Sequence, residues 1–245
     1  MRHPAILLLL LLTVAGCDSV ATSGAMPTAA FSFAPAEPRA GQLVTFEAED
    51  AGEGRDGAVF RWDFDGDGQS DATGKSVTYA FAQEGQADVT LVVRGESGLA
   101  ARASESVDVL APYTQVTLQN VALTAMSFAD EDGSVWEGDA SPNLYYEVYW
   151  RDGETYRFYR ASSQVRDVTP IDLPVRFDSA LELPDLSKEY RLVLMTQGRM
   201  SNSLPGRSVD RVALDIRTLA QTSPTHVTLE GARGATFEVD LDWSL

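Results

Sequence analysis

Cysteine and histidine are nearly absent from this chain of 245 residues, which holds one cysteine and two histidines. A single cysteine excludes an internal disulfide, so apolar cores or bound ions must stabilise the fold. The two histidines form no metal-ligand pair, and the chain has neither a Gly-x-Ser-x-Gly segment nor a glycine-rich phosphate loop. We therefore expect a protein that is not an enzyme. The 36 acidic residues leave open only a carboxylate pair of the glycosidase type, because the fold sets its spacing.

Positive charge is also scarce. Nineteen lysines and arginines stand against 36 acidic residues, and the formal net charge is −17. Such a surface repels a phosphate backbone, so we expect no nucleic-acid partner. It also excludes a polybasic membrane patch. Two interpretations of the acidity remain open: general solvation of the surface, or carboxylates gathered at cation sites.

The only cysteine, Cys17, follows an N-terminal apolar segment. Arg2 and His3 precede an apolar run at 5–12, which is too short to span a bilayer, and small residues then lead to the cysteine. Val-Ala-Gly-Cys at 14–17 resembles the bacterial lipobox, in which the cysteine is acylated and the preceding peptide is removed. An ordinary signal peptide with an incidental cysteine is the alternative.

The lipobox resemblance implies a location. We expect residues 1–16 to be a lipoprotein signal peptide and Cys17 to carry the lipid that anchors the protein in a membrane of the cell envelope. The anchored chain would lie at the outer membrane or cell surface, or on the periplasmic face. Residues 17–28 are rich in Ser, Ala, Thr and Gly without an apolar period, and this predicts a flexible tether.

Short alternating segments separated by turn residues follow the tether. They lie at 31–33, 43–46, 59–64, 77–79, 89–93 and 107–109, and then at 116–118, 121–123, 144–149, 156–158, 190–194, 212–216 and 237–241. Alternation of this kind predicts half-buried strands. We therefore predict an all-β chain of two tandem antiparallel β-sandwiches, at 29–111 and 113–245, with Pro112 at the boundary.

The first half resembles a known family. Phe-Arg-Trp-Asp-Phe-Asp-Gly-Asp-Gly at 60–68 is followed by Val-Thr-Tyr-Ala-Phe at 77–81, Gly85 and Asp-Val-Thr-Leu-Val-Val at 88–93. This order is similar to the PKD domain, whose hallmark is a WDFGDG-type strand and turn. The resemblance implies an immunoglobulin-like sandwich that serves as a spacer or binding module, with Trp62 and Phe64 in its core. The hallmark is lengthened here, because Asp65 precedes Gly66 and residues 69–71 are inserted.

The same turn carries a candidate metal site. Asp63, Asp65 and Asp67 alternate, Gly68 follows, and Asp71 comes three residues later. Oxygen ligands at alternate positions before a sharp glycine turn suit a hard cation such as Ca²⁺. The twelfth position of an EF-hand loop would need glutamate, and here it is glycine. The alternative is a purely structural turn, because Asp63 belongs to the hallmark of the fold.

A second acidic cluster lies in the other half, with Asp130, Asp132, Asp139 and Asn143 as candidate Ca²⁺ ligands. The cluster before the strand at 144 resembles the first calcium loop of a C2-type sandwich. The resemblance implies a C2-like domain at 113–245. An asparagine stands where that pattern has an aspartate, and the segment at 196–210, where the second calcium loop would fall, has only a late aspartate, Asp210. These departures favour a structural role for the loop.

Aromatic residues cluster at 145–159, and we single out Tyr149 and Trp150 as candidate ligand-binding residues. Outward rings suit sugar stacking or a protein interface, whereas the alternative is cross-strand pairing within a hairpin. His226, in an alternating segment, is expected on the surface. We expect a lipid-anchored, non-catalytic scaffold for adhesion or assembly with a surface protein or glycan, stabilised by calcium at its acidic loops. The alternative is a carbohydrate-binding surface lipoprotein.

Overall fold

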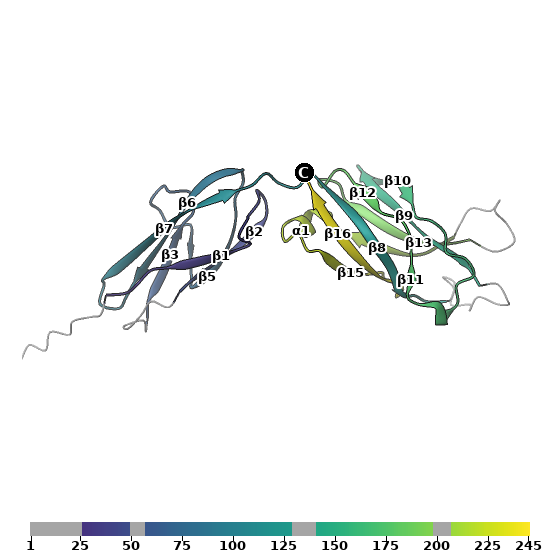
Figure 1. Ribbon diagram of the computed structural model, residues 1–245, viewed down its shortest axis with the longest axis horizontal. Helices are drawn as coiled ribbons and strands as arrows, with labels where there is room; N and C mark the ends of the chain where they lie inside the picture. The colour runs from purple at the N-terminus through teal and green to yellow at the C-terminus, as the bar shows by residue number, and fades with distance from the viewer. Residues whose placement is uncertain (1–25, 50–56, 129–140, 198–206) are drawn as a thin grey trace, which may run out of the picture.

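Two hydrophobic cores divide the chain in the computed structural model, which describes residues 26–49, 57–128, 141–197 and 207–245. One core is built from side chains between 29 and 109, and the other from side chains between 116 and 243. Each lies between two antiparallel sheets, so the chain consists of two β-sandwiches side by side (Figure 1). The all-β fold expected from the alternating segments is confirmed.

The first sandwich has a sheet of three strands facing a sheet of four. The strand orders are β1-β2-β5 and β4-β3-β6-β7. The strands are β1 (Phe31–Ala34), β2 (Leu43–Ala48), β3 (Val59–Asp63), β4 (Ala72–Thr73), β5 (Ser76–Ala80), β6 (Gly85–Arg94) and β7 (Ala100–Val109). The two-residue strand β4 is too short to show alternation, so the sequence did not predict it.

Aromatic rings fill the first core. Trp62 and Phe64 stack with their centroids 6.0 Å apart, and Phe46 meets Phe64 at 4.9 Å. The indole N–H of Trp62 donates to the backbone oxygen of Gly74 at 2.9 Å, which satisfies the only polar group of that side chain. Trp62 and Phe64 are both buried, so the inward orientation implied by the PKD resemblance is confirmed.

The second sandwich has a sheet ordered β10-β9-β13-β14 and a sheet ordered β11-β8-β16-β15, in which β12 also pairs with β8. Its strands are β8 (Gln115–Ala125), β9 (Asn143–Asp152), β10 (Thr155–Ala161), β11 (Val175–Arg176), β12 (Leu181–Leu183), β13 (Tyr190–Gln197), β14 (Arg207–Leu214), β15 (His226–Glu230) and β16 (Thr236–Ser244). A 3₁₀ turn, η1 (Pro170–Asp172), and a short helix, α1 (Ile216–Ala220), complete it.

Two predicted boundaries differ from the structure. The segments at 116–118 and 121–123 are one strand, β8, in which Asn120 adopts a left-handed φ of 49° where the register with β16 shifts. Asparagine tolerates that conformation better than most residues. The segment predicted as a strand to Ile216 ends earlier, because β14 stops at Leu214 and Ile216 begins α1. Asp215 caps this helix by accepting a hydrogen bond from Thr218 N at 3.1 Å.

Asp210 links the two sheets of the second sandwich. Its side chain is only 4% exposed and accepts backbone N–H groups from Arg211 at 2.7 Å and from Arg233 and Ala235 at 3.0 Å each. The first donor lies in β14, and the other two lie at the turn from β15 to β16. A Cβ on Gly231 would meet a carboxylate oxygen of Asp210 at 2.3 Å, so any other residue at this position would displace the Asp210 carboxylate.

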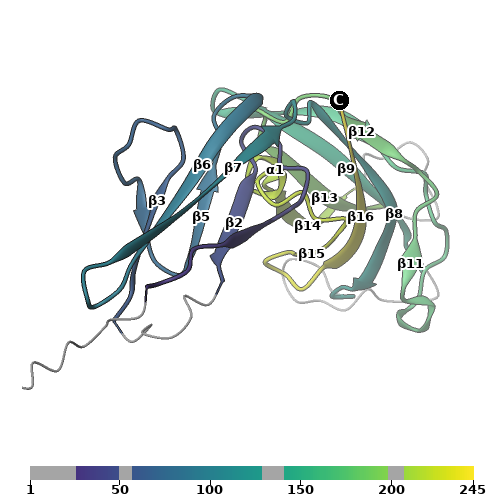
Figure 2. The same ribbon diagram turned by 60° about the vertical axis from the view of Figure 1, so that its left-hand side comes forward.

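The two sandwiches touch near the connection between them. The Arg39 guanidinium donates to the Ala111 carbonyl oxygen at 2.7 Å and lies 4.3 Å from the ring centroid of Tyr113. Leu43 N, in β2, donates to the Gln221 carbonyl oxygen beside α1 at 2.7 Å, and Figure 2 shows these elements next to each other. Within the described ranges, no helix is long and apolar enough to cross a membrane.

Candidate functional site

The aspartate-rich loop after β3 is held by its own backbone. Asp63, buried at the end of β3, accepts N–H groups from Gly66 at 2.7 Å and from Gly68 at 2.9 Å. Both glycines have φ near +80°, a conformation that glycine adopts without steric cost. Asp71 accepts the N–H of Phe64 at 2.7 Å and closes the loop.

Three of the four aspartates predicted to bind calcium come together. Asp63, Asp65 and Asp71 each offer a carboxylate oxygen, and these oxygens lie within 4.8 Å of one another. Asp67 is not part of this group. Its carboxylate accepts the backbone N–H of Gln69 at 2.7 Å and the side-chain amide of Gln69 at 2.9 Å. Backbone N–H donors stabilise the charges of this loop without an ion. Calcium binding therefore stays a prediction.

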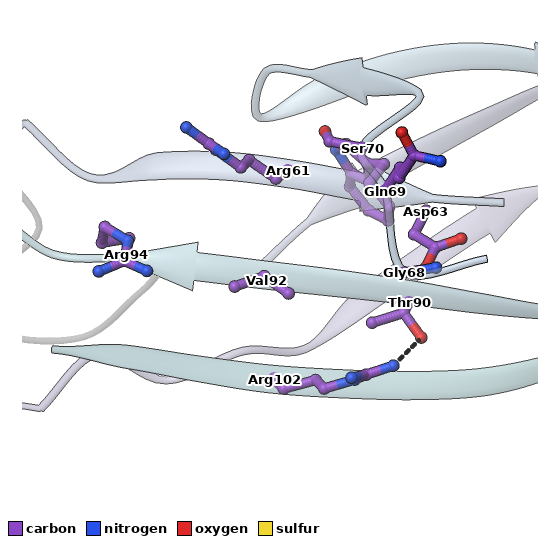
Figure 3. A pocket seen from close by; sticks show the side chains of 10 residues that line it. Arg61, Asp63, Gly68, Gln69, Ser70, Thr90, Val92, Arg94 and Arg102 are labelled. Atoms are coloured by element: carbon purple, nitrogen blue, oxygen red, sulfur yellow. Dashed lines mark hydrogen bonds between the residues drawn. The ribbon is translucent and has the colours of Figure 1, made fainter. Parts of the chain in front are cut away.

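A hollow of about 220 Å³ opens beside this loop on the outer face of the four-stranded sheet. Figure 3 shows Arg61 on β3, Arg94 on β6 and Arg102 on β7 around Val92, with the aspartate loop at one end. The Arg102 guanidinium donates to the hydroxyl of Thr90 at 3.2 Å. Gln69 and Ser70 also line the hollow. The aspartate loop predicted from the sequence thus forms one wall of a hollow whose other walls carry three arginines.

The second predicted acidic cluster is described only in part. Asp130, Asp132 and Asp139 lie outside the described residues. Asn143 opens β9, and its side-chain oxygen accepts the backbone N–H of Asp167 at 3.2 Å. The late aspartate of the facing segment, Asp210, is the buried link between sheets described above. The side-chain oxygens of Asn143 and Asp210 therefore both accept hydrogen bonds from backbone N–H groups.

The outer face of the sheet β10-β9-β13-β14 gathers aromatic and arginine side chains. We define the aromatic face as Tyr145, Tyr149, Tyr156, Phe158, Arg191, Val193, Met195 and Arg211. Cross-strand register places Phe158 opposite Tyr149, and Tyr149 opposite Arg191. A hollow of about 480 Å³ is lined by six of these residues together with Ser208. This volume lies within the range usual for small-ligand sites.

The two predicted ligand-binding residues lie on opposite sides of β9. Tyr149 is on the aromatic face. Trp150, one residue later, packs against the core of the sandwich, and Lys188 Nζ lies 4.6 Å from its ring centroid. Successive strand residues point to opposite faces, so the pair cannot act as one platform. Phe158 and Tyr156 on β10 accompany Tyr149 instead.

Two of the four rings of the aromatic face are fixed by hydrogen bonds. The Tyr149 hydroxyl donates to Glu147 at 2.5 Å, and the Tyr156 hydroxyl donates to Glu189 at 2.6 Å. Burial, together with the Glu147 carboxylate, raises the pKa of Tyr149 to about 12, so the phenol stays a donor at every physiological pH. Rings held in this way lose little conformational entropy when a ligand binds.

Apolar and cationic groups complete this face. Val193 and Met195 are buried, with exposures of 7% and 9%, but they are not part of the core cluster between the two sheets. The Arg191 guanidinium lies 3.6 Å from the ring centroid of Tyr156. Neither Arg191 nor Arg211 forms an ion pair with a carboxylate of the described residues. Phe158 is 55% exposed.

Comparison with known proteins assigns the first half. Residues 24–110 match the PKD domain family. The first sandwich is therefore a PKD domain, as its aromatic core and aspartate turn led us to expect. The matched segment ends at the last strand of the first sandwich, and the C2 resemblance of the second sandwich stays a prediction.

The PKD domain occupies only part of the chain, and other comparisons add little. A solved structure from a study of promiscuous carbohydrate-binding modules of the β-sandwich superfamily is 15% identical, with a TM-score of 0.33. The alignment covers 91% of this chain and 99% of that one. The comparison with curated proteins gives no match.

The arginines of both surfaces were not predicted from the sequence as site residues. Arg61 precedes the hallmark tryptophan, so the alternation that buries Trp62 turns Arg61 outward. The same argument applies to Arg191, which precedes the buried Leu192. That signal was available within each strand. Which strands are neighbours, and hence which arginines meet, follows only from the sheet order.

Proposed function

We propose that the protein is a lipid-anchored, non-catalytic binding module of the cell envelope, and that the aromatic face of its second sandwich binds a glycan. The observation that carries this proposal is the set of hydrogen-bonded rings on a solvent-facing sheet, with Phe158 more than half exposed. Sugar rings present C–H groups that pack on the negative face of an aromatic ring. Their hydroxyls suit the arginines and carboxylates between the rings.

The aromatic face favours a glycan over the other candidates. A nucleic acid would also use rings and arginines, but the net charge of −17 opposes a polyanionic phosphate chain. A protein partner in a scaffold would be expected to cover a larger apolar patch than the single exposed ring of Phe158. Among the described residues of this face, every carboxylate near a ring serves as a hydrogen-bond acceptor for a tyrosine hydroxyl.

A glycan array tests the proposal. We expect the protein to be retained by a defined group of oligosaccharides and Phe158→Ser and Tyr149→Ala to lose that retention at least tenfold. Thr228→Ala, on the opposite sheet of the same sandwich, is the matched control and should bind as the parent does. Loss of retention in the control as well, or no loss in the two face variants, would contradict the assignment.

Trp150→Ala separates a folding defect from a binding defect. Because Trp150 packs against the core, its loss should lower the melting temperature. The variant should keep its glycan retention at temperatures where it is folded. Loss of retention in a folded Trp150→Ala protein would indicate that the glycan binds on the side of β9 that carries Trp150 and not on the aromatic face.

The lipid anchor is proposed from the sequence alone, since Cys17 lies outside the described residues. Cells grown with an alkyne-bearing fatty acid should label the parent protein and leave Cys17→Ala unlabelled. Ser19→Ala is a neighbouring control that should label fully. Equal labelling of the parent and Cys17→Ala would remove the anchor from the proposal.

Calcium stabilisation is proposed for the aspartate loop of the PKD domain. A ligand that binds only the folded state raises the melting temperature. We expect millimolar Ca²⁺ to raise the melting temperature of the parent protein and to leave the melting temperature of Asp65→Asn unchanged. Asp65 is an exposed member of the group formed by Asp63, Asp65 and Asp71. The same midpoint in calcium and in chelator would show that the loop is stabilised by its backbone donors alone.

A further inference from the structure

Three of the five basic residues described in the PKD domain share one sheet face. They are Arg61, Arg94 and Arg102, and the other two are Arg39 and Lys75. Register aligns Arg61, Val92 and Arg102 across β3, β6 and β7. Arg94 lies two residues along β6 on the same side. We name these three residues the arginine face.

The arginine face is a local cationic cluster within an acidic protein. The net charge of −17 repels polyanions over the surface as a whole, so an anionic ligand can bind only where positive charges gather as they do here. None of its guanidinium groups forms an ion pair with a carboxylate of the described residues. Arg94 donates to the Gly98 carbonyl oxygen at 3.0 Å, and Arg102 donates to a neutral hydroxyl. Asp63 lines the same hollow, but both of its oxygens accept backbone N–H groups. The guanidinium charges, which persist at every accessible pH, are therefore available to an external anion.

The shape of the face narrows the class of ligand. Neighbouring strands lie about 4.8 Å apart, and β6 lies between β3 and β7. The backbones of Arg61 and Arg102 are therefore roughly 10 Å apart across the sheet. That span fits two successive anionic groups better than one. The hollow of about 220 Å³ is smaller than the sites that enclose drug-sized ligands. It admits one ring or one anionic group, while the rest of a longer ligand would lie along the strands.

Neutral hydrogen-bonding groups stand at the aspartate-loop end of the hollow, away from Arg94 (Figure 3). The side chains of Gln69, Ser70 and Thr90 line it beside the arginines (Figure 3). Hydroxyl and amide groups match the hydroxyls of a sugar, and guanidinium forks match carboxylate or sulfate oxygens. The single aromatic residue that lines the hollow, Trp62, has its ring buried in the core, so no ring is exposed there to stack on a nucleic-acid base.

We propose that the arginine face of the PKD domain binds an acidic polysaccharide, with carboxylate or sulfate groups on Arg61, Arg94 and Arg102 and sugar hydroxyls on Gln69, Ser70 and Thr90. This site is separate from the aromatic face. An anionic bilayer presents similar charges, but it is flat, whereas the basic surface here is a concave hollow that includes neutral hydroxyl and amide partners.

Binding of the full chain to immobilised polymers tests this site. The probes are polygalacturonate, dextran sulfate, uncharged dextran and vesicles of phosphatidylglycerol. We expect retention by one or both acidic polymers, a loss of about tenfold for each of Arg61→Gln and Arg102→Gln, and weaker binding as salt rises. Lys75→Gln removes the same charge elsewhere on the domain and should bind as the parent does. These side chains are exposed, so the variants should melt as the parent does.

Three outcomes would overturn the proposal, and a fourth would support it. Equal loss in Lys75→Gln would indicate that the loss follows the more negative net charge of the variant and not the removal of a contact on the arginine face. Retention by vesicles but by neither acidic polymer would indicate a membrane surface. Acidic-polymer binding that survives Arg61→Gln and Arg102→Gln but is lost in Phe158→Ser would place the polymer on the aromatic face, which leaves the proposed function standing. Glycan retention lost only in the aromatic-face variants, with polymer binding lost only in the arginine variants, would support both sites.

Discussion

The two outer faces of the second sandwich differ in how their side chains are satisfied. On the outer face of β15 and β16, His226 contacts both Glu238 and Asp240. Thr228 donates to Glu238 at 3.2 Å, and Asn120 donates to Asp240 at 2.8 Å. We call this group the polar face. Its charges and hydrogen-bonding groups are largely satisfied among themselves.

The aromatic face, on the opposite sheet, leaves much unsatisfied. It exposes a large apolar ring, Phe158, and two arginines without ion pairs to described carboxylates. Exposed rings do not stabilise a folded chain, and they increase its tendency to aggregate. The same core supports both faces, so the difference between them does not arise from folding requirements. It marks the aromatic face as the place where binding is expected.

The largest effect should come from the core that both faces share. Phe237 is fully buried and meets the rings of Tyr146 at 6.3 Å and Phe177 at 6.5 Å. We expect Phe237→Ala to lower the free energy of unfolding by about 3–5 kcal/mol, because it leaves a cavity. Urea denaturation measures this loss. A loss below about 1 kcal/mol would mean that the two sheets do not depend on a common core.

A smaller effect should follow from cutting the link between the two sheets. Asp210→Ala removes the acceptor of three backbone N–H groups, two of which lie at the turn before β16. Unsatisfied buried donors should lower the free energy of unfolding by roughly 2–4 kcal/mol. Asp210→Asn keeps one acceptor oxygen and should lose less. Equal stability of Asp210→Ala and the parent in urea would show that solvent replaces the carboxylate.

A still smaller change in stability should separate the two faces. Phe158→Ser removes a ring that is mostly exposed and that contacts one other ring among the described residues, Tyr149, at 5.8 Å. We expect the free energy of unfolding to change by less than about 1 kcal/mol. Thr228→Ala on the polar face should change it by a similar amount. A large loss in Phe158→Ser alone would mean that the exposed ring serves the fold rather than a ligand.

Much of the fold could be predicted from the sequence because period-two alternation is a local signal. It located the long strands and the inward Trp62, but it did not decide which of Tyr149 and Trp150 points outward. Short strands such as β11 carry too few residues to alternate, and the helix α1 is only five residues long. A buried Ile216 looks like strand continuation until the capping role of Asp215 is seen.

The candidate sites were less predictable, because they depend on which strands are neighbours. The aspartate turn was visible as a spacing, whereas its backbone donors were not. Trp150 looked like the partner of Tyr149 in the sequence, yet adjacent strand residues face opposite ways. The pairing of Tyr149 with Phe158 and Arg191 depends on the order β10-β9-β13, which no local pattern encodes.

The smallest effect concerns the titration of the polar face. Hydrogen bonds to Asp240 and Glu238 raise the pKa of His226 above its usual value of 6.5. A raised folded-state pKa means that the protonated histidine stabilises the fold. This contribution is fully present below about pH 6.5, where the unfolded chain is also protonated, and it is lost as pH rises through the folded-state pKa. His226 also lowers the pKa of Asp240, so the contribution of that carboxylate is lost in acid.

The comparison of the two faces therefore predicts a pH window. The difference in melting temperature between the parent and His226→Gln should be largest near pH 5–6 and shrink as the buffer is brought to pH 9. Phe158→Ser should differ from the parent by the same amount at every pH in that range, because the ring that Phe158 contacts belongs to Tyr149, whose pKa of about 12 lies above it. Melting curves at one-unit intervals measure both. A His226→Gln difference that does not vary with pH would show that the histidine stays neutral, and that the polar face is stabilised by hydrogen bonds alone.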